Sequence, residues 1–325
     1  RTNLYGKAAF KLKFDAFVPN QKFLGLTRMT LNSMVQDPSF VHEDSAYRLY
    51  RAMGVTAPRT TYSWVKVNGA DFGLYMNVEA VDSQMLKRWM TVNHLYSSNC
   101  YLADITPSQS GCYDTNFGDA NRSDLNAAIA TSNLDGADWW REINKVADMT
   151  AVINLMATDI YTSNWDGYTG ASISNYYLHS DDNGRFQMLP WGVDQIFGGG
   201  VEKRAPYSFG QPIGGLLFTQ CLAVSTCRAL YVQALRDVRD RASTLGLASV
   251  AATLHATLES KIASDTKDET SPSASKAAQV AASGFILARP SKVNLWLAQL
   301  TRVTAPLISG TTAVGQVLSA TSGTW

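Results

Sequence analysis

The chain has 325 residues, of which 46% are hydrophobic and 10% aromatic, so it can bury a large core and we expect one large two-lobed domain or two smaller ones. Its 28 basic and 27 acidic residues leave a formal net charge of +1, which excludes the broad basic surface of a nucleic-acid-binding protein. No apolar run approaches the roughly 20 residues that a membrane-spanning helix needs, so we expect no membrane span.

The first predicted elements are two strands and a helix. Phe10–Asp15 and Leu24–Asn32 alternate apolar and polar residues, which is the period of a strand with one buried face. A helix is predicted over Ser39–Met53, because Asp37 can cap it, a proline follows that cap, and Gly54 can end it.

A hairpin is predicted next. Thr61–Val67 and Gly73–Val78 are strand-like and are joined across Asn68 and Gly69, a dipeptide typical of two-residue hairpin turns. Together with the preceding elements, this hairpin predicts a compact, strand-rich α+β lobe.

The chain becomes mainly helical after this lobe. Asp148–Ser163 has the apolar spacing of a buried helix, and a second hairpin is predicted from Asn175–Ser180 and Arg185–Trp191. Helical sequence then continues over Cys221–Leu300, interrupted by the polar stretch Ser264–Ser275, which we expect to be exposed and mobile.

The four cysteines form two local pairs, Cys100 with Cys112 and Cys221 with Cys227. No CxxC spacing is present, so this grouping favours two short-range disulfides over a metal site. Four cysteines allow three pairings, and buried free thiols are the alternative interpretation.

The composition changes again from Val303 to the end of the chain at Trp325, where threonine, glycine, serine and valine dominate. The segment resembles the first strands of the immunoglobulin-like repeats of secreted bacterial proteins. The alternative is an ordinary β-rich tail that packs on the preceding domain.

Three polar residues suggest a reaction. Asp166 follows the buried helix, Asn175 begins the second hairpin, and Asp194 follows its return strand. The two hairpin ends lie at the same edge of the ribbon, so Asn175 and Asp194 can share one ion, and oxygen ligands of this kind suit Mg²⁺ or Mn²⁺. A carboxylate that orients a hydroxyl, together with metal ligands, is what phosphoryl transfer needs.

An ordered series of motifs resembles the CotH kinase family of spore-coat proteins over about residues 1–300. The motifs are Leu24–Leu26, Asp37–Phe40, Gly54–Arg59, Asn68–Tyr75, Val78–Asp82, Asn164–Tyr168, Asn175–Leu178, Pro190–Asp194 and Phe197–Gly199.

The resemblance implies a two-lobed atypical protein-kinase fold, with a strand-rich lobe over residues 1–80, a mainly helical catalytic lobe over 81–300 and a β-rich segment over 301–325. It also implies ATP as donor, Mg²⁺ or Mn²⁺ as cofactor, and a protein hydroxyl as acceptor. Asp166 matches the family's catalytic aspartate and Asp194 its metal-binding aspartate, whereas Asn175 is a kinase-like extension from position. Many relatives have an acidic residue where this chain has Gly192, so a second metal carboxylate is missing.

A kinase-like phosphate clamp predicts a cation held by an acidic partner. Lys11, Lys13 and Arg28 are the candidate cations of the first lobe, and Glu43 on the following helix is the candidate partner. Glu79 lies where the lobes join and is a further candidate for contact with nucleotide or metal.

Two other functions stay open. A catalytically weak cell-surface binding module could use the same fold, because fold alone does not decide function. A glycosidase would need two acids about 5 to 10 Å apart. The resemblance and the cysteine pairs predict a secreted or surface-attached bacterial protein with a nucleotide ligand.

Overall fold

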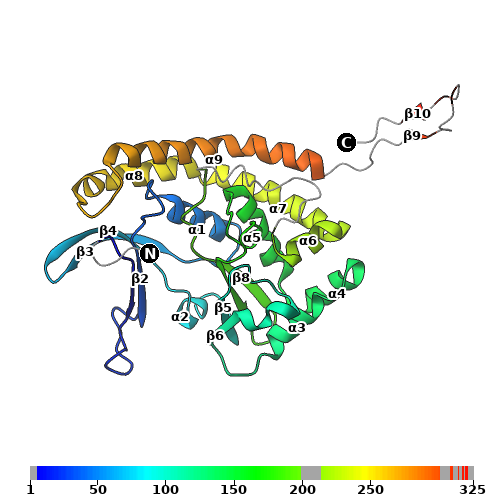
Figure 1. Cartoon of the computed structure of the whole chain (residues 1–325), viewed down its shortest axis with the longest axis horizontal. Helices are drawn as coiled ribbons and strands as arrows, with labels where there is room; N and C mark the ends of the chain where they lie inside the picture. Colours follow the sequence, from blue (N-terminus) through cyan, green and yellow to red (C-terminus); the bar gives the residue numbers. More distant parts are fainter. Residues whose placement is uncertain are drawn as a thin grey trace.

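The structure is a computed structural model that describes residues 6–198, 214–300, 308–309, 314, 317 and 319–320 (Figure 1). Its strands are β1 (Phe10–Lys13), β2 (Arg28–Asn32), β3 (Thr60–Val67), β4 (Ala70–Val78), β5 (His94–Ser98), β6 (Tyr113–Phe117), β7 (Tyr176–Ser180), β8 (Phe186–Pro190), β9 (Ile308–Ser309) and β10 (Ser319–Ala320). Its helices are α1 (His42–Ala52), α2 (Ser83–Leu86), the 3-10 helix η1 (Pro107–Cys112), α3 (Ser123–Thr131), α4 (Gly136–Val146), α5 (Met149–Thr162), α6 (Leu216–Ala223), α7 (Ser225–Thr244), α8 (Leu247–Ser264) and α9 (Pro272–Leu300).

The first sheet is antiparallel and has the strand order β1-β2-β4-β3. The predicted hairpin turn is confirmed, because Asn68 and Gly69 both have positive φ, at 51° and 82°, as a type I′ turn requires. Along β2, Arg28 and Asn32 point to the same face of the sheet, since side chains alternate along a strand. That face carries Asn32 towards α1, where it bonds Glu43.

Helix α1 starts later than the sequence suggests. The expected start was Ser39, but the carboxylate of Asp37 first accepts the backbone N–H of Ser39 at 3.0 Å and then that of His42 at 2.8 Å. Asp37 therefore closes a turn before the helix begins at His42. The helix buries Tyr47 and Tyr50 completely in the main core.

A second antiparallel sheet, in the order β6-β5-β7-β8, lies on the opposite side of α5 from the long helices α8 and α9 (Figure 1). The β7–β8 hairpin is the second hairpin that the sequence predicts. Helix α5 is also confirmed, with Asp148 accepting from the N–H of Ala151 at its start and Ser163 in a left-handed conformation at its end. Sheets followed by helices make the chain an α+β protein, as expected.

Most residues of the predicted polar stretch between α8 and α9 are exposed, as expected, but two of its carboxylates have buried side chains. Lys7 is buried and pairs with Asp265 at 2.8 Å and with Asp268 at 2.9 Å. Asp265 also accepts the backbone N–H of Leu74 in β4 at 2.8 Å. Polar composition predicted exposure, but these carboxylates are buried because a lysine and a strand amide satisfy them.

The C-terminal segment 301–325 lies mostly outside the described residues, as does Gly199 in the last motif. The described part contains the short antiparallel pair β9 and β10. The immunoglobulin-like repeat therefore stays a prediction. Within the described ranges, no helix is both long and apolar enough to cross a membrane.

Candidate active site

The loop between α5 and β7 brings Asp166 and Asn175 together. The side-chain amide of Asn175 donates to Asp166 Oδ2 at 2.6 Å, and its backbone N–H donates to the Asp166 carbonyl at 2.9 Å. Asp166 is 8% exposed, and among the described residues its Oδ1 has no hydrogen-bond partner. Buried carboxylate oxygens usually have a hydrogen-bond partner, so Oδ1 of Asp166 is an acceptor that a ligand could use.

The close approach of the loop backbone depends on Gly167. A Cβ at this position would lie 2.3 Å from the Asn164 side-chain nitrogen and 2.9 Å from Asp159 Oδ2. Glycine is therefore needed for packing here. The loop can turn tightly beside Asp166 because Gly167 leaves that space to its neighbours.

Asp194 follows β8 and contacts the first residue of α1. His42 at the start of α1 places its Nδ1 2.8 Å from the Asp194 carbonyl oxygen. The carboxylate lies close enough to Asp166 that its charge contributes to the raised pKa of Asp166. The structure therefore gathers Asp166, Asn175 and Asp194, which the sequence predicted to converge.

Three acidic groups of this site have pKa values well above their usual range. Burial and then the nearby charge of Asp37 raise the pKa of Asp194 to about 6. Burial and then Asp194 raise the pKa of Asp166 to about 7. The pKa of Glu43 rises to about 8, first because of burial and then because of Asp194. The charge of Asp194 raises the pKa of both Asp166 and Glu43, so a cation bound beside Asp194 would favour the ionised forms of all three groups.

The oxygen donors fit Mg²⁺ or Mn²⁺ in their chemistry. Across the described ranges, no three histidine, cysteine or acidic side chains are grouped to enclose a metal ion on their own. Mg²⁺ commonly takes one or two protein oxygens and completes its shell with water and substrate phosphate. The carboxylate of Asp194 and the amide oxygen of Asn175, whose nitrogen is already used by Asp166, can supply two such oxygens.

Gly192 sits in this pocket with a positive φ of 61°. A Cβ here would lie 3.1 Å from the side-chain carbon of Asn175, which is tighter than ordinary packing. An acidic residue at this position would therefore be strained and would press on Asn175. The chain has no second carboxylate here, and its local backbone is suited to glycine.

The predicted clamp between Glu43 and a first-sheet cation is wrong. In the part of the chain that the structure describes, Glu43 forms no ion pair, and it accepts from the side-chain amide of Asn32 at 2.5 Å and from the Tyr47 hydroxyl at 3.5 Å. Lys11, Lys13 and Arg28 are exposed. A neutral amide suits Glu43 because burial favours its protonated form.

The cations lie elsewhere on the first sheet. Lys13 is 3.9 Å from Asp15, and Arg28 lies opposite Lys13 in the β1–β2 pair. Arg28 lines a cavity of about 310 Å³ at the end of the sheet together with Glu79. Glu79 is paired with Arg59 at 2.9 Å and with Arg88, so its carboxylate is already engaged.

Sequence reasoning missed four residues of the site. Asn32 bonds Glu43, and His42 contacts the carbonyl of Asp194. The charge of Asp37 acts on Asp194, and Asp159 packs against Gly167 of the loop. The alternation of β2 could have pointed to Asn32, because it puts Asn32 on the same face as Arg28. The side chain of Asp37 looked like a helix cap, and its role beside Asp194 has no sequence signal.

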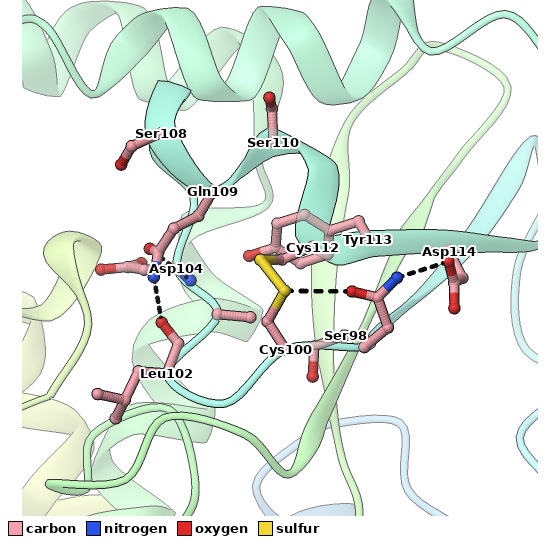
Figure 2. The surroundings of a disulfide bond; sticks show 12 residues. Ser98, Cys100, Leu102, Asp104, Ser108, Gln109, Ser110, Cys112, Tyr113 and Asp114 are labelled. Atoms are coloured by element: carbon pink, nitrogen blue, oxygen red, sulfur yellow. Dashed lines mark hydrogen bonds between the residues drawn. A yellow bond between two sulfur atoms is a disulfide. The ribbon is translucent and has the colours of Figure 1, made fainter.

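Both predicted disulfides are present. Cys100 is bonded to Cys112 in the loop before β6, and Cys221 is bonded to Cys227 between α6 and α7. Figure 2 shows the first bond and its surroundings. The chain around this bond contains η1 and β6.

Comparison with known proteins identifies the family. The profile described as CotH kinase protein matches residues 2–290. The chain belongs to the CotH kinase family. It is 26% identical over 200 residues to the inner spore coat protein H of Bacillus subtilis (strain 168), covering 56% of this chain and 53% of that protein.

Two more similarities are weaker. An inner spore coat protein H-like protein of the same strain is 30% identical over 73 residues, covering 22% of each chain. A solved Shewanella oneidensis MR-1 structure of the toxin–antitoxin system HipA, HipB and its operator DNA is 12% identical, covering 94% of this chain and 68% of that one, with a TM-score of 0.45. That structural likeness is too weak to support an inference. The chain spans about half the length of the spore coat protein that it matches first.

Proposed function

We propose that this CotH-family chain is a metal-dependent phosphotransferase that uses ATP to phosphorylate serine or threonine hydroxyls of secreted or surface proteins. The observation that carries the proposal is that Asp166 is bonded to Asn175 and that the charge of the buried Asp194 acts on Asp166. Family membership supports the kinase activity. Among the described residues, Oδ1 of Asp166 has no hydrogen-bond partner, which supports a role in accepting a hydrogen bond from the substrate hydroxyl.

In this proposal each side chain has one task. Asp166 Oδ1 accepts the hydrogen bond of the incoming hydroxyl and orients its oxygen towards the transferred phosphate. Asn175 fixes the Asp166 carboxylate through the 2.6 Å bond and offers its own oxygen to the cofactor. Asp194 and Asn175 would hold the metal, which neutralises phosphate charge when bound.

The raised pKa of Asp166 is consistent with a group that accepts a proton near neutral pH. Burial and then the charge of Asp194 raise its pKa to about 7, which favours the protonated form. A bound cation would oppose the effect of Asp194 and lower that pKa. Asp166 would then be ionised and ready to accept a hydrogen bond when nucleotide and metal are present.

The direct test is transfer of label from ATP to a protein extract or to the chain itself, with Mn²⁺ or Mg²⁺ present. We expect transfer by the wild type and none above background by Asp166→Asn. Serine and threonine should carry the label in acid hydrolysates. Equal labelling by both proteins would refute the role of Asp166, and labelling by neither would refute the activity.

A second candidate function is a surface binding module with little catalytic power. Gly192 favours it, because the pocket lacks a carboxylate at a position where many relatives have one. Nucleotide-dependent stabilisation separates the two functions. Ligand at about a hundred times its dissociation constant should stabilise a true nucleotide site by roughly 2.7 kcal/mol, whereas a module without such a site should not respond.

The proposed location is outside the cytoplasm, as a secreted or surface-attached protein. Two disulfides support it, because such bonds persist in oxidising compartments. The spore coat name of the related Bacillus protein points in the same direction. Blocking thiols during cell lysis and measuring which fraction of the protein is oxidised tests this location.

A further inference from the structure

The loop closed by the first disulfide lies against the loop that carries Asp166. We define the strap as residues 98–113, which includes the Cys100–Cys112 bond, and the catalytic loop as residues 166–175. We infer that the strap positions the catalytic loop, so that reduction of Cys100–Cys112 lowers phosphoryl transfer while nucleotide binding is retained. This inference rests on the proposed phosphotransferase function.

Side chains at both ends of the catalytic loop bond to the strap. At one end, Tyr168 donates its hydroxyl to Asp104 Oδ1 at 2.9 Å. At the other end, Ser98 donates its hydroxyl to the carbonyl of Ser174 at 3.0 Å. Movement of the strap would therefore be felt at both ends of the loop that holds Asp166.

The middle and the exit of the catalytic loop are also held. Tyr101 of the strap bonds the hydroxyl of Ser172. Tyr176, which follows Asn175 in β7, donates to the carbonyl of Ala103 at 2.9 Å and contacts the hydroxyl of Tyr113 at 2.6 Å. The strap thus supports the segment that positions Asn175 as well as the segment that positions Asp166.

Asp104 is the residue of the strap that connects most of this arrangement. Its second oxygen, Oδ2, accepts the backbone N–H of Leu216 at 2.7 Å at the start of α6. Its backbone N–H donates to Gln109 Oε1 at 3.0 Å, and Gln109 also donates to the Leu102 carbonyl, as Figure 2 shows. We assign Asp104 as a positioning residue, since its bonds join strap, catalytic loop and α6.

The strap needs a restraint because part of its backbone is unfavourable. Leu102 has a φ of 60°, a left-handed conformation that a leucine adopts only when its surroundings hold it there. Along the chain, the disulfide-bonded Cys100 lies two residues before Leu102, and the side chain of Gln109 bonds the Leu102 carbonyl (Figure 2). Without the disulfide, the segment around Leu102 would relax and release Asp104 and Tyr101.

The two disulfides differ in access to reductants. Cys100 and Cys112 are partly exposed, whereas Cys221 and Cys227 are fully buried. Attack by a thiolate requires access to a sulfur atom, so a dithiol should reduce the strap bond first. The dithiol supplies two electrons and two protons, the strap bond becomes two thiols, and the dithiol closes to its own disulfide.

The test treats the full chain with dithiothreitol at a concentration at which alkylation and peptide mass spectrometry find only Cys100 and Cys112 modified. We expect kcat to fall about tenfold or more, because small misplacements of a catalytic group are costly. Affinity for a nonhydrolysable ATP analogue should fall much less than kcat, because Asp194, one of the two proposed metal ligands, makes no bond to the strap among the described residues. Reoxidation should restore kcat.

Matched variants guard against general unfolding. Asp104→Asn should lower kcat, because an amide has only one acceptor oxygen and cannot accept from both the Tyr168 hydroxyl and the Leu216 N–H. Asp114→Asn is the control, since Asp114 is exposed next to the strap and bonds only the side chain of Asn99 in the described structure. Cys221→Ser with Cys227→Ser tests whether loss of any disulfide has the same effect.

Hydrogen exchange separates this inference from the proposed function. The amides of Ser174 and Asn175 both donate to the Asp166 carbonyl, so their protection reports on the catalytic loop directly. Faster exchange at these amides after selective reduction supports the strap even if no transfer is found in any state. Unchanged exchange and unchanged kcat would overturn it, as would an equal loss of kcat and nucleotide affinity.

Discussion

Asp159 and Asp166 are two buried aspartates at the same end of α5, and they differ in how many of their carboxylate oxygens have hydrogen-bond partners. Burial raises the pKa of both, to about 6 for Asp159 and to about 7 for Asp166. Asp159 accepts hydrogen bonds on both oxygens, from Tyr50 and Asn164 on one and from Thr169 on the other. Asp166 accepts on one oxygen and, among the described residues, leaves the other without a partner.

The difference separates a structural carboxylate from a functional one. The bonds of Asp159 hold α1, α5 and the catalytic loop together, and nothing about it calls for a ligand. Asp166 is costly to bury in its present state, because an unsatisfied buried oxygen loses its hydration. A raised pKa alone would not have distinguished the two residues, whereas the hydrogen-bond partners do.

The largest expected effect comes from Asp194→Ala. We expect metal-dependent nucleotide binding to be lost, with an affinity at least about 100-fold lower, because the metal bridges the protein to phosphate. Calorimetric titration with a nonhydrolysable ATP analogue and Mg²⁺ measures it. Asp182→Ala, an exposed residue of the β7–β8 turn, is the control and should bind like the wild type. Wild-type affinity in Asp194→Ala would rule out its role.

Asp166→Asn should separate chemistry from binding. Transfer should fall by about 10²- to 10⁴-fold, the usual contribution of a proton-accepting group, while nucleotide affinity stays near that of the wild type. Steady-state rates at saturating ATP check the first part and titration checks the second. If affinity and rate fell together, Asp166 would be a ligand of the nucleotide and not the group that orients the hydroxyl.

Asp159→Ala should affect stability more than binding. Removing the carboxylate leaves the hydroxyl of Tyr50 and the amide of Asn164 without an acceptor, so we expect a loss of about 2 to 4 kcal/mol in the free energy of unfolding. Urea unfolding measures it. Asp166→Ala should cost much less, because one of its oxygens makes no bond in the described structure. Equal losses would remove the distinction between the two residues.

The pH dependence of stability tests the acidic pocket as a whole. The folded-state pKa values of Asp194, Asp166 and Glu43, at about 6, 7 and 8, lie above the unfolded values near 4. The folded chain then binds more protons than the unfolded chain between about pH 4 and 8, so this contribution to stability is present below pH 4 and is lost as pH rises.

The corresponding experiment compares the free energy of unfolding at pH 5 and pH 8. The wild type should lose more stability over this range than Asp194→Ala, because the variant removes one charge and lowers the pKa of both neighbours. Mg²⁺ should stabilise the wild type more at pH 8 than at pH 5. An identical pH slope in both proteins would mean that the three carboxylates do not interact.

The smallest expected effect is that of Gly192→Ala. The left-handed backbone and the tight contact with Asn175 should cost about 1 to 2 kcal/mol of stability. Thermal unfolding with Gly54→Ala as control checks it, since Gly54 also has a positive φ but an open surrounding. A larger loss in Gly192→Ala than in Gly54→Ala reports the contact with Asn175. Equal losses would mean that the left-handed backbone alone accounts for the cost.

Much of the fold follows from local signals in the sequence. Asn68 and Gly69 determine a hairpin turn on their own, and the apolar spacing of α5 is visible within one helix. Asn175 precedes the first strand of the β7–β8 hairpin and Asp194 follows the second, so hairpin geometry predicts that both lie at the same edge of the ribbon.

Apart from the start of α1, the sequence missed contacts between elements that are separate in the chain. Glu43 was expected to pair with a cation. In the fold it bonds the amide of Asn32, and burial favours its protonated form. No local pattern indicated that Lys7 is buried with its two carboxylate partners in the α8–α9 turn. Side-chain pairing across more than one element depends on packing angles that periodicity does not contain.

The most direct test of the central claim is a crystal of the chain grown with Mn²⁺ and a nonhydrolysable ATP analogue, examined by anomalous scattering at the manganese edge. We predict a manganese peak about 2.0 to 2.3 Å from the Asp194 carboxylate and the Asn175 amide oxygen, shared with the nucleotide phosphates. Asp166 should lie beside the terminal phosphate and should not contact the metal. A nucleotide bound away from this pocket, or a metal held without Asp194, would contradict the account.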